Sequence, residues 1–207
     1  MPLIYLIRHG ENNQVKQKRL AGRLPNVHLN DKGRQQAQSL AAILAEHTFQ
    51  AVISSPLERT METARPLATQ LDVHVIPAEG LLEIDYGTWE GKTLKQLQRR
   101  KLWPLVQHHP ARVRFPHGES FQEAQARAVA EVERLRSLYA ARDARVACFS
   151  HSDIIKLILS YYIGLSLDHF QRLHVAPASI SILALADDYV HLMTMNDQRA
   201  NHPHPSL

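Results

Sequence analysis

The chain contains 207 residues, 44% of them hydrophobic and 21% charged, and it carries a formal net charge of +4 and 13 histidines. These are ordinary values for a globular protein, so the composition excludes an intrinsically disordered or fibrous chain. The length fits one large domain or two small ones. The small excess of positive charge is compatible with an anionic ligand but does not by itself indicate one.

The distribution of apolar residues and cysteine restricts the cellular setting. No apolar run approaches the roughly 20 residues that a membrane-spanning helix needs. The first run, residues 3–7, is too short for a signal peptide. The single cysteine, Cys148, excludes an internal disulfide and a zinc site built from several cysteines. We therefore predict a cytoplasmic protein that has no membrane partner.

Short apolar runs alternate with helical patterns along the chain. The runs predict strands at 3–7, 51–54, 73–76, 145–149, 179–185 and 191–195, and the helical patterns cover 31–45, 57–71, 119–140 and 153–162. Strands that alternate with helices are typical of a largely parallel sheet with both faces covered. We therefore predict an α/β protein, a three-layer α/β/α sandwich with a mostly parallel central sheet.

The chain shows neither an internal repeat nor a linker rich in Gly, Ser or Pro. We predict a single domain over residues 1–196, followed at 197–207 by a polar, proline-bearing and flexible tail. The segment 101–116 contains prolines and a pair of histidines. We interpret it as an insertion over one end of the sheet.

Charged and nucleophilic side chains follow four of the predicted strands. Arg8 and His9 follow the first, Arg59 the second, Glu83 the third and His151 the fourth. Ligands bind beyond the carboxyl ends of parallel strands, so these side chains are expected to converge on one crevice. Guanidinium groups match phosphate oxygens, and an imidazole can attack phosphorus. The set therefore predicts a phosphate site.

The residues around this set carry a family resemblance. The run 6–11, Leu-Ile-Arg-His-Gly-Glu, is similar to the signature of the histidine phosphatase superfamily, which includes cofactor-dependent phosphoglycerate mutases. The similarity continues in order through Gly22 and through residues 29–37, 54–59, 82–91, 116–120 and 149–151. Because the matches span nearly the whole chain, their joint occurrence by chance is improbable.

The resemblance implies a phosphoglycerate mutase-like fold and a role for each residue of the set. It implies that His9 is the nucleophile and Glu83 the general acid, and that Arg8, Arg59 and His151 bind the transferring phosphoryl group. It also implies a metal-independent hydrolysis through a phosphohistidine intermediate, without a cofactor. The partner is then a small phosphorylated metabolite or a phosphoprotein; neither the physiological substrate nor the oligomeric state follows from the sequence.

Two positions depart from the family pattern. An Asn is common six residues after the nucleophile, where this chain has Val15, and a Gly is common after the second His, where it has Ser152. The first departure leaves one phosphate contact open, and Asn12 or Asn13 is a candidate replacement. The second either adds a hydroxyl to the site or is tolerated without a role there.

Several alternatives stay open at this point. Asp85 and Glu90 compete with Glu83 for the role of acid. A phosphoglycerate-type mutase is the second enzymatic interpretation. Such mutases typically carry a His-Tyr-Gly run where this chain has the run 85–87, Asp-Tyr-Gly, so the resemblance favours hydrolysis. A phosphate-binding module without catalysis is the third. Nucleic acid is not expected as a partner, because 99–103 is one short basic stretch with a single aromatic residue.

Overall fold

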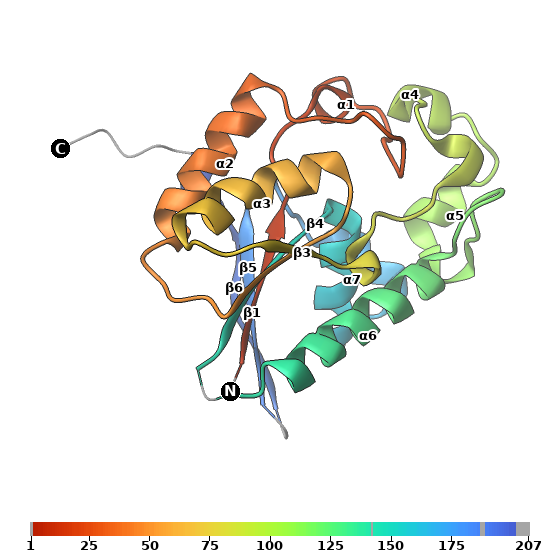
Figure 1. The fold of residues 1–207 in the computed structure, drawn as a ribbon. Helices are drawn as coiled ribbons and strands as arrows, with labels where there is room; N and C mark the ends of the chain where they lie inside the picture. The colour runs from red at the N-terminus through yellow and green to blue at the C-terminus, as the bar shows by residue number, and fades with distance from the viewer. Residues whose placement is uncertain (1, 142, 187–188, 202–207) are drawn as a thin grey trace.

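The structure, a computed structural model, describes residues 2–141, 143–186 and 189–201 (Figure 1). Within this part, one six-stranded sheet has the order β3-β2-β4-β1-β5-β6. The strands are β1 (Leu3–Arg8), β2 (Ala51–Ser54), β3 (Val75–Pro77), β4 (Arg145–Ser150), β5 (Ile180–Leu185) and β6 (Val190–Asp197). The first four run parallel, whereas β5 pairs antiparallel with β1 and with β6. The predicted mostly parallel sheet is confirmed.

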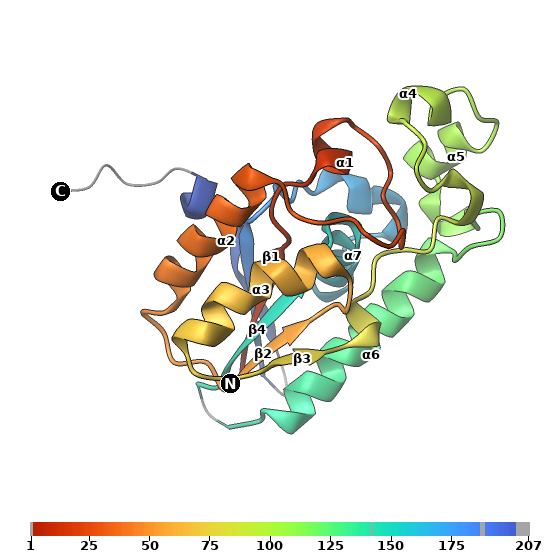
Figure 2. The same ribbon diagram turned by 45° about the horizontal axis from the view of Figure 1, so that its top comes forward.

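Helices cover both faces of the sheet. Helices α2 (Asp31–Leu44) and α3 (Glu58–Gln70) lie on one face, and α6 (Phe121–Leu138) and α7 (Ser152–Tyr162) lie on the other (Figures 1 and 2). The predicted three-layer arrangement is therefore present. None of the helices that the structure describes is both long and apolar enough to cross a bilayer.

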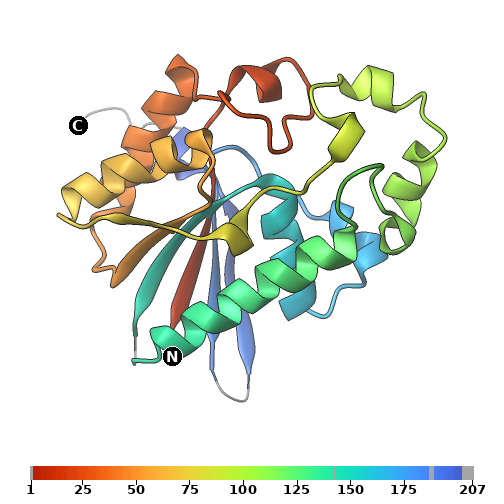
Figure 3. The ribbon, with the colours of Figure 1, turned by 45° about the vertical axis from the view of Figure 1, so that its right-hand side comes forward.

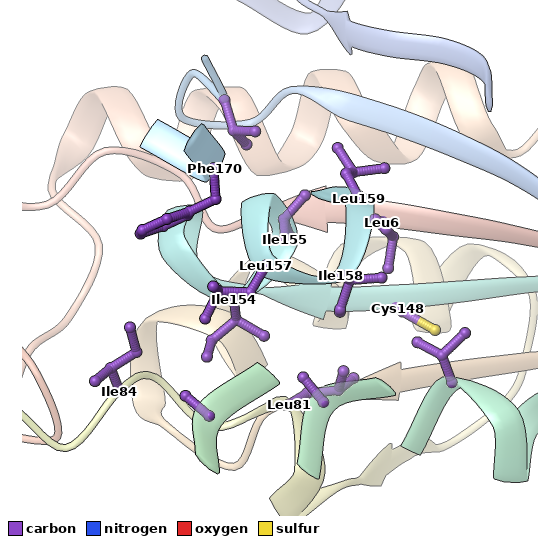
Figure 4. Close-up of a cluster of buried hydrophobic side chains, with 14 of the residues drawn as sticks. Leu6, Leu81, Ile84, Cys148, Ile154, Ile155, Leu157, Ile158, Leu159 and Phe170 are labelled. Carbon is purple, nitrogen blue, oxygen red and sulfur yellow. The ribbon is translucent and has the colours of Figure 1, made fainter. Parts of the chain in front are cut away.

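Side chains of β1 alternate between two hydrophobic cores, one on each face of the sheet. Tyr5 and Ile7 pack with α2 and α3, whereas Ile4 and Leu6 belong to the cluster that includes α6 and α7. Successive side chains of a strand point to opposite faces, so a strand buried on both faces reads as a continuous apolar run. Figure 4 shows the second core, in which Leu6 lies near residues of α7.

Three short helices gather at the carboxyl end of the parallel strands. Helices α1 (Asn13–Lys16) and α4 (Leu94–Leu97) lie toward the end to which the β1 arrow points, and α5 (Trp103–His108) follows α4 (Figures 1 and 3). The predicted insertion at 101–116 contains α5. It packs against the 3-10 helix Leu167–Arg172 that comes after α7.

β3 begins at Val75, two residues later than predicted. The reason is the end of α3, where Asp72 adopts a positive φ of 53°. The N–H of Val73 donates to the carbonyl of Ala68 at 3.0 Å, and the N–H of Asp72 donates to that of Thr69 at 3.3 Å. This pair of bonds is a Schellman motif, which engages the backbone of the apolar Val73 in ending the helix.

The ordered chain continues beyond the predicted start of the tail. β6 extends to Asp197, and Arg199–Asn201 forms a 3-10 helix in which Ala200 is 4% exposed. The Asn201 side chain accepts a bond from Gln36 and donates one to the carbonyl of Pro177. The sequence analysis expected a flexible tail from residue 197. The structure differs, because residues 197–201 belong to β6 and to this 3-10 helix and make these contacts. The rest of the predicted tail, residues 202–207, lies outside the described residues.

Candidate active site

The turn after β1 is fixed by its backbone. The N–H of His9 donates to the carbonyl of Ser150 at the end of β4, and the carbonyl of His9 accepts from Ala178 before β5. The next N–H, that of Gly10, donates to the hydroxyl of Thr63 on α3 at 3.0 Å. His9 is thus held from both neighbouring strands and from one helix.

The ring of His9 is presented in its neutral form. The side chain is buried, with 3% of the residue exposed, and Nδ1 lies 2.7 Å from the carbonyl of Gly10. A carbonyl only accepts, so Nδ1 carries the hydrogen and Nε2 has a free lone pair. Burial lowers the pKa of His9 well below its ordinary value, and the charges of Arg59 and Arg8 add to this. Nε2 is therefore available as a nucleophile at neutral pH.

Two guanidinium groups, one buried and one half-buried, stand beside this ring. Arg59, 1% exposed, donates from Nη2 to the carbonyl of Gly22 at 2.8 Å and to Nδ1 of His151 at 3.2 Å. Arg8 donates from Nη1 to the carbonyl of Val175. Among the described residues, Nε and Nη1 of Arg59 and Nε of Arg8 find no partner. Unpaired cationic donors in a buried site are what an anion such as phosphate requires.

His151 is a second neutral ring. Because Nδ1 accepts from Arg59, the hydrogen is on Nε2, which lies 2.9 Å from Oγ of Ser55. The ring centroid is 5.3 Å from that of His9, and Nδ1 is 4.0 Å from Oε2 of Glu83. Burial and the charge of Arg59 lower the pKa of His151 well below its ordinary value. His151 thus links the nucleophile, the arginine and the acid predicted from the sequence.

Glu83 is positioned through its backbone. Its carbonyl accepts from Nε of Arg23 at 2.8 Å and from Nη2 of Arg127 at 3.0 Å. Both arginines also pair with the carboxylate of Glu119, at 2.9 and 2.8 Å. In the Glu83 side chain, Oε1 accepts a local bond from the N–H of Ile84 at 3.0 Å. The clamp of Arg23, Arg127 and Glu119 fixes the chain while the carboxyl group stays free for chemistry.

The environment of Glu83 suits an acid and base near neutrality. Burial, followed by the negative charge of Asp153, raises the pKa of Glu83 to about 7, and Arg59 opposes the shift. Asp153 is half-buried, but it accepts from the hydroxyl of Tyr86 at 2.7 Å and pairs with Lys156 at 2.6 Å. These partners outweigh burial and lower the pKa of Asp153, so it stays charged. A group with a pKa near ambient pH can both donate and accept a proton.

The predicted residues surround one cavity. It has a volume of 290 Å³, and Arg8, His9, Arg59 and Glu83 line it. His151 stands behind this wall, in contact with Arg59. The structure therefore brings all five predicted residues together at the carboxyl ends of the strands. We call this space the phosphate cavity.

Asp85 and Glu90, the competitors for the acid role, lie elsewhere. Oδ1 of Asp85 accepts from the N–H of Gly87 at 2.9 Å, and Oε1 of Glu90 accepts from the N–H of Arg23 at 2.8 Å. Neither carboxylate is among the described residues that line the phosphate cavity. The geometry favours Glu83.

Asn12 is a site residue that the sequence left undecided. Its Oδ1 accepts from the N–H of Val15 at 2.8 Å and so caps α1. This cap leaves Nδ2 buried and without a partner among the described residues, and Asn12 lines the phosphate cavity. Asn13 is exposed on α1, whereas Ser152 lines the cavity and donates to the carbonyl of Val175 at 3.3 Å. Only the fold could distinguish Asn12 from Asn13.

Comparisons with known proteins agree with this site. The model of the histidine phosphatase superfamily, branch 1, matches residues 4–198, and the chain belongs to this superfamily. A bifunctional protein of Mycobacterium tuberculosis is 33% identical over 183 residues, which are 86% of this chain and 49% of that protein. The chain thus spans about half the length of the mycobacterial relatives that it matches.

Two further proteins are similar over most of their own length. GpmB of Escherichia coli, a probable phosphoglycerate mutase, is 32% identical over 181 residues, 86% of this chain and 82% of that protein. The solved structure of YhfR from Bacillus stearothermophilus superposes with a TM-score of 0.90 at 25% identity and covers 97% of this chain and 99% of that one. The fold is thus shared across the whole length of a solved relative.

Proposed function

We propose that this chain is a histidine phosphatase that hydrolyses a phosphomonoester through a phosphohistidine on His9. The observation that carries the proposal is the cavity in which unpaired donors of Arg8 and Arg59 meet a neutral imidazole with a free Nε2. Membership of the superfamily supports it. Substrates are then small phosphorylated molecules, and the cytoplasmic location stays a prediction from the sequence.

The mechanism has two steps. Nε2 of His9 attacks phosphorus in line with the ester oxygen, the P–O bond breaks, and protonated Glu83 gives its proton to the departing alcohol. Glu83, now a carboxylate, takes a proton from water, which attacks the phosphohistidine and releases inorganic phosphate and neutral His9. Arg8 and Arg59 stabilise the negative charge that the phosphoryl oxygens carry in both steps.

A phosphoglycerate-type mutase is the second candidate, and the similarity to a probable mutase favours it. In a mutase the phosphohistidine is transferred to a substrate hydroxyl and not to water. The sequence Asp-Tyr-Gly at 85–87 differs from the His-Tyr-Gly run of such mutases. Incubation with a phosphoglycerate separates the two candidates, because a phosphatase releases inorganic phosphate and a mutase yields the isomeric phosphoglycerate.

An assay with a generic aryl phosphate in the presence of EDTA tests the proposed function. Because arginine side chains supply the positive charge at the cavity, we expect steady release of phosphate that EDTA leaves unchanged. Activity that disappears with the chelator and returns with magnesium or zinc would overturn the metal-independent mechanism. Binding of phosphate without any turnover would favour a phosphate-binding module.

Replacing Asn12 by serine is expected to lower kcat/KM by a factor of roughly ten or more, because the buried Nδ2 donor to the phosphoryl group is lost. Serine is also a good N-cap, so α1 keeps its cap. The matched control is Asn13→Ser on the exposed side of the same turn, which should retain wild-type kinetics. Equal kinetics in the two variants would remove Asn12 from the phosphate site.

A further inference from the structure

A second cavity adjoins the phosphate cavity. It has a volume of 280 Å³, and the two walls share Leu20, Tyr86, Leu94 and Asp153. Residues of α4, of α5 and of the segments that flank these helices line much of it. Figure 2 shows α4 and α5 near each other. The alcohol portion of a substrate bound through its phosphoryl group extends away from His9, and the second cavity is open to it across the four shared residues.

The wall of this second cavity is apolar and largely aromatic. We call it the apolar cavity and define it by Trp89, Leu97, Trp103, Val106, Phe115 and Phe121. The rings of Trp89 and Trp103 are stacked with centroids 6.2 Å apart, and Phe115 meets Trp89 edge-on at 5.3 Å. Such a wall gains free energy when it covers apolar surface of a ligand.

Three of the polar side chains in this wall, those of Tyr86, Asp153 and Gln171, have partners within the protein, and a fourth, Gln107, is an uncharged amide. The amide of Gln171 donates to the carbonyl of Val106 at 2.8 Å. The carboxylate of Asp153 accepts from Tyr86 and pairs with Lys156. Among the described residues, no arginine, lysine or histidine lines the apolar cavity. A carboxylate placed there would lose its hydration without gaining a cationic partner, and it would face the negative charge of Asp153, which disfavours a charged alcohol portion.

The size of the apolar cavity fits one ring. A cavity of about 150 Å³ accommodates benzene, so 280 Å³ holds an aromatic ring with a short linker or a branched aliphatic group of similar bulk. The ring enters past the residues shared with the phosphate cavity, with its phosphate ester at His9. The linker then has to pass only the residues that the two cavities share.

We propose that the apolar cavity binds the alcohol portion of the substrate, and that the preferred phosphomonoesters carry an uncharged aromatic or branched apolar group a few bonds from the ester oxygen. This inference rests on the proposed phosphatase activity and assigns its substrate class. Phosphate esters whose alcohol portion bears a carboxylate, such as phosphoglycerates, are then poor substrates.

The first test compares 3-phenylpropyl phosphate with n-propyl phosphate. The two leaving alcohols have similar basicity, so a difference in kcat/KM reports contact with the ring and not the chemical step. We expect the phenyl ester to be favoured by a factor of about ten to one hundred, as for burial of one aromatic side chain. Phosphoglycerate should fall below both esters. Equal kcat/KM for the phenyl and propyl esters would overturn the proposal.

A pair of variants on α5 locates the effect. Val106→Phe fills the apolar cavity and should abolish the preference for the phenyl ester, and circular dichroism checks that the variant is folded. Leu105→Phe makes the same kind of change on a side chain that is 38% exposed and lies outside the cavity wall. It should keep the wild-type preference. Loss of the preference in both variants, or in neither, contradicts the assignment.

A binding measurement separates this proposal from the proposed function. The chain contains two tryptophans, and both line the apolar cavity. Titration with 3-phenylpropan-1-ol should give a saturable change in tryptophan fluorescence in the wild type and in Leu105→Phe, but not in Val106→Phe. If neither ester is hydrolysed, the phosphatase proposal fails, whereas this fluorescence change would still support an aromatic-binding cavity. Hydrolysis without any fluorescence change would support the phosphatase proposal and would contradict the proposal that the apolar cavity binds the alcohol portion.

Discussion

Replacing His9 by alanine is expected to lower turnover by a factor on the order of 10³ or more, because the atom that attacks phosphorus is removed. The fold should persist, since the N–H and carbonyl of His9 make the bonds to Ser150 and Ala178 and alanine retains both. Steady-state kinetics with an aryl phosphate measure the first effect, and circular dichroism with thermal unfolding measures the second.

The control for this experiment is His28→Ala. His28 is an exposed histidine that pairs with Glu62 away from the phosphate cavity, so its removal should leave the kinetics unchanged. A His9→Ala protein that turns over at a comparable rate to the wild type would eliminate covalent catalysis through His9.

Replacing Glu83 by glutamine is expected to separate the two steps of the reaction. An aryl phosphate has a good leaving group that hardly needs an acid, so the variant should still form the phosphohistidine. Hydrolysis of that intermediate needs the base, and the phosphoenzyme should therefore accumulate. An alkyl phosphate needs the acid in the first step as well, so its rate should fall further than the rate with the aryl ester. Quenching without acid and detecting acid-labile phosphate on His9 measures the intermediate.

The same residue sets the pH dependence. The acid form of Glu83 is lost as the pH rises through about 7, so kcat/KM of the wild type for an alkyl phosphate should decline above that pH. The decline should be absent in Glu83→Gln. Asp85→Asn and Glu90→Gln are the matched controls, because neither side chain lines the phosphate cavity. Equal rate losses for the alkyl and aryl esters, without trapped phosphoenzyme, would transfer the acid role to one of these two residues.

The fold was predictable where the pattern is local. The apolar run at 51–54 coincides with β2, and the ends of the predicted helices lie within two residues of the ends of α2, α3, α6 and α7. The sequence could not place the start of β3, because the turn at Asp72 depends on backbone bonds at the end of α3. The polar composition of residues 197–201 is the same as that expected of a flexible tail. Their contacts with Gln36 and Pro177, which the sequence does not show, place them in the ordered part of the chain.

The site was predictable to the extent that motifs follow strand ends. The five residues singled out in the sequence lie together, and their roles are the ones we propose. The sequence held no signal for the clamp that Arg23 and Arg127 form with Glu119, because both arginines are far along the chain from Glu83, whose carbonyl they bind. The hydrogen bond from Tyr86 to Asp153 could not be predicted either, because it joins α7 to a loop 67 residues earlier. Such contacts arise only when the layers pack.

The burial of Glu83 also has a thermodynamic consequence for the whole fold. Its carboxyl group has an ordinary pKa of 4.5 and a pKa of about 7 in the folded protein, so between these values the folded state holds a proton that the unfolded state has released. The contribution of that proton to the free energy of unfolding is complete below pH 4.5 and is lost as the pH rises through about 7. Its loss amounts to roughly 3 kcal/mol. The burial that makes Glu83 an effective acid near neutrality therefore leaves the empty protein less stable in mildly alkaline solution.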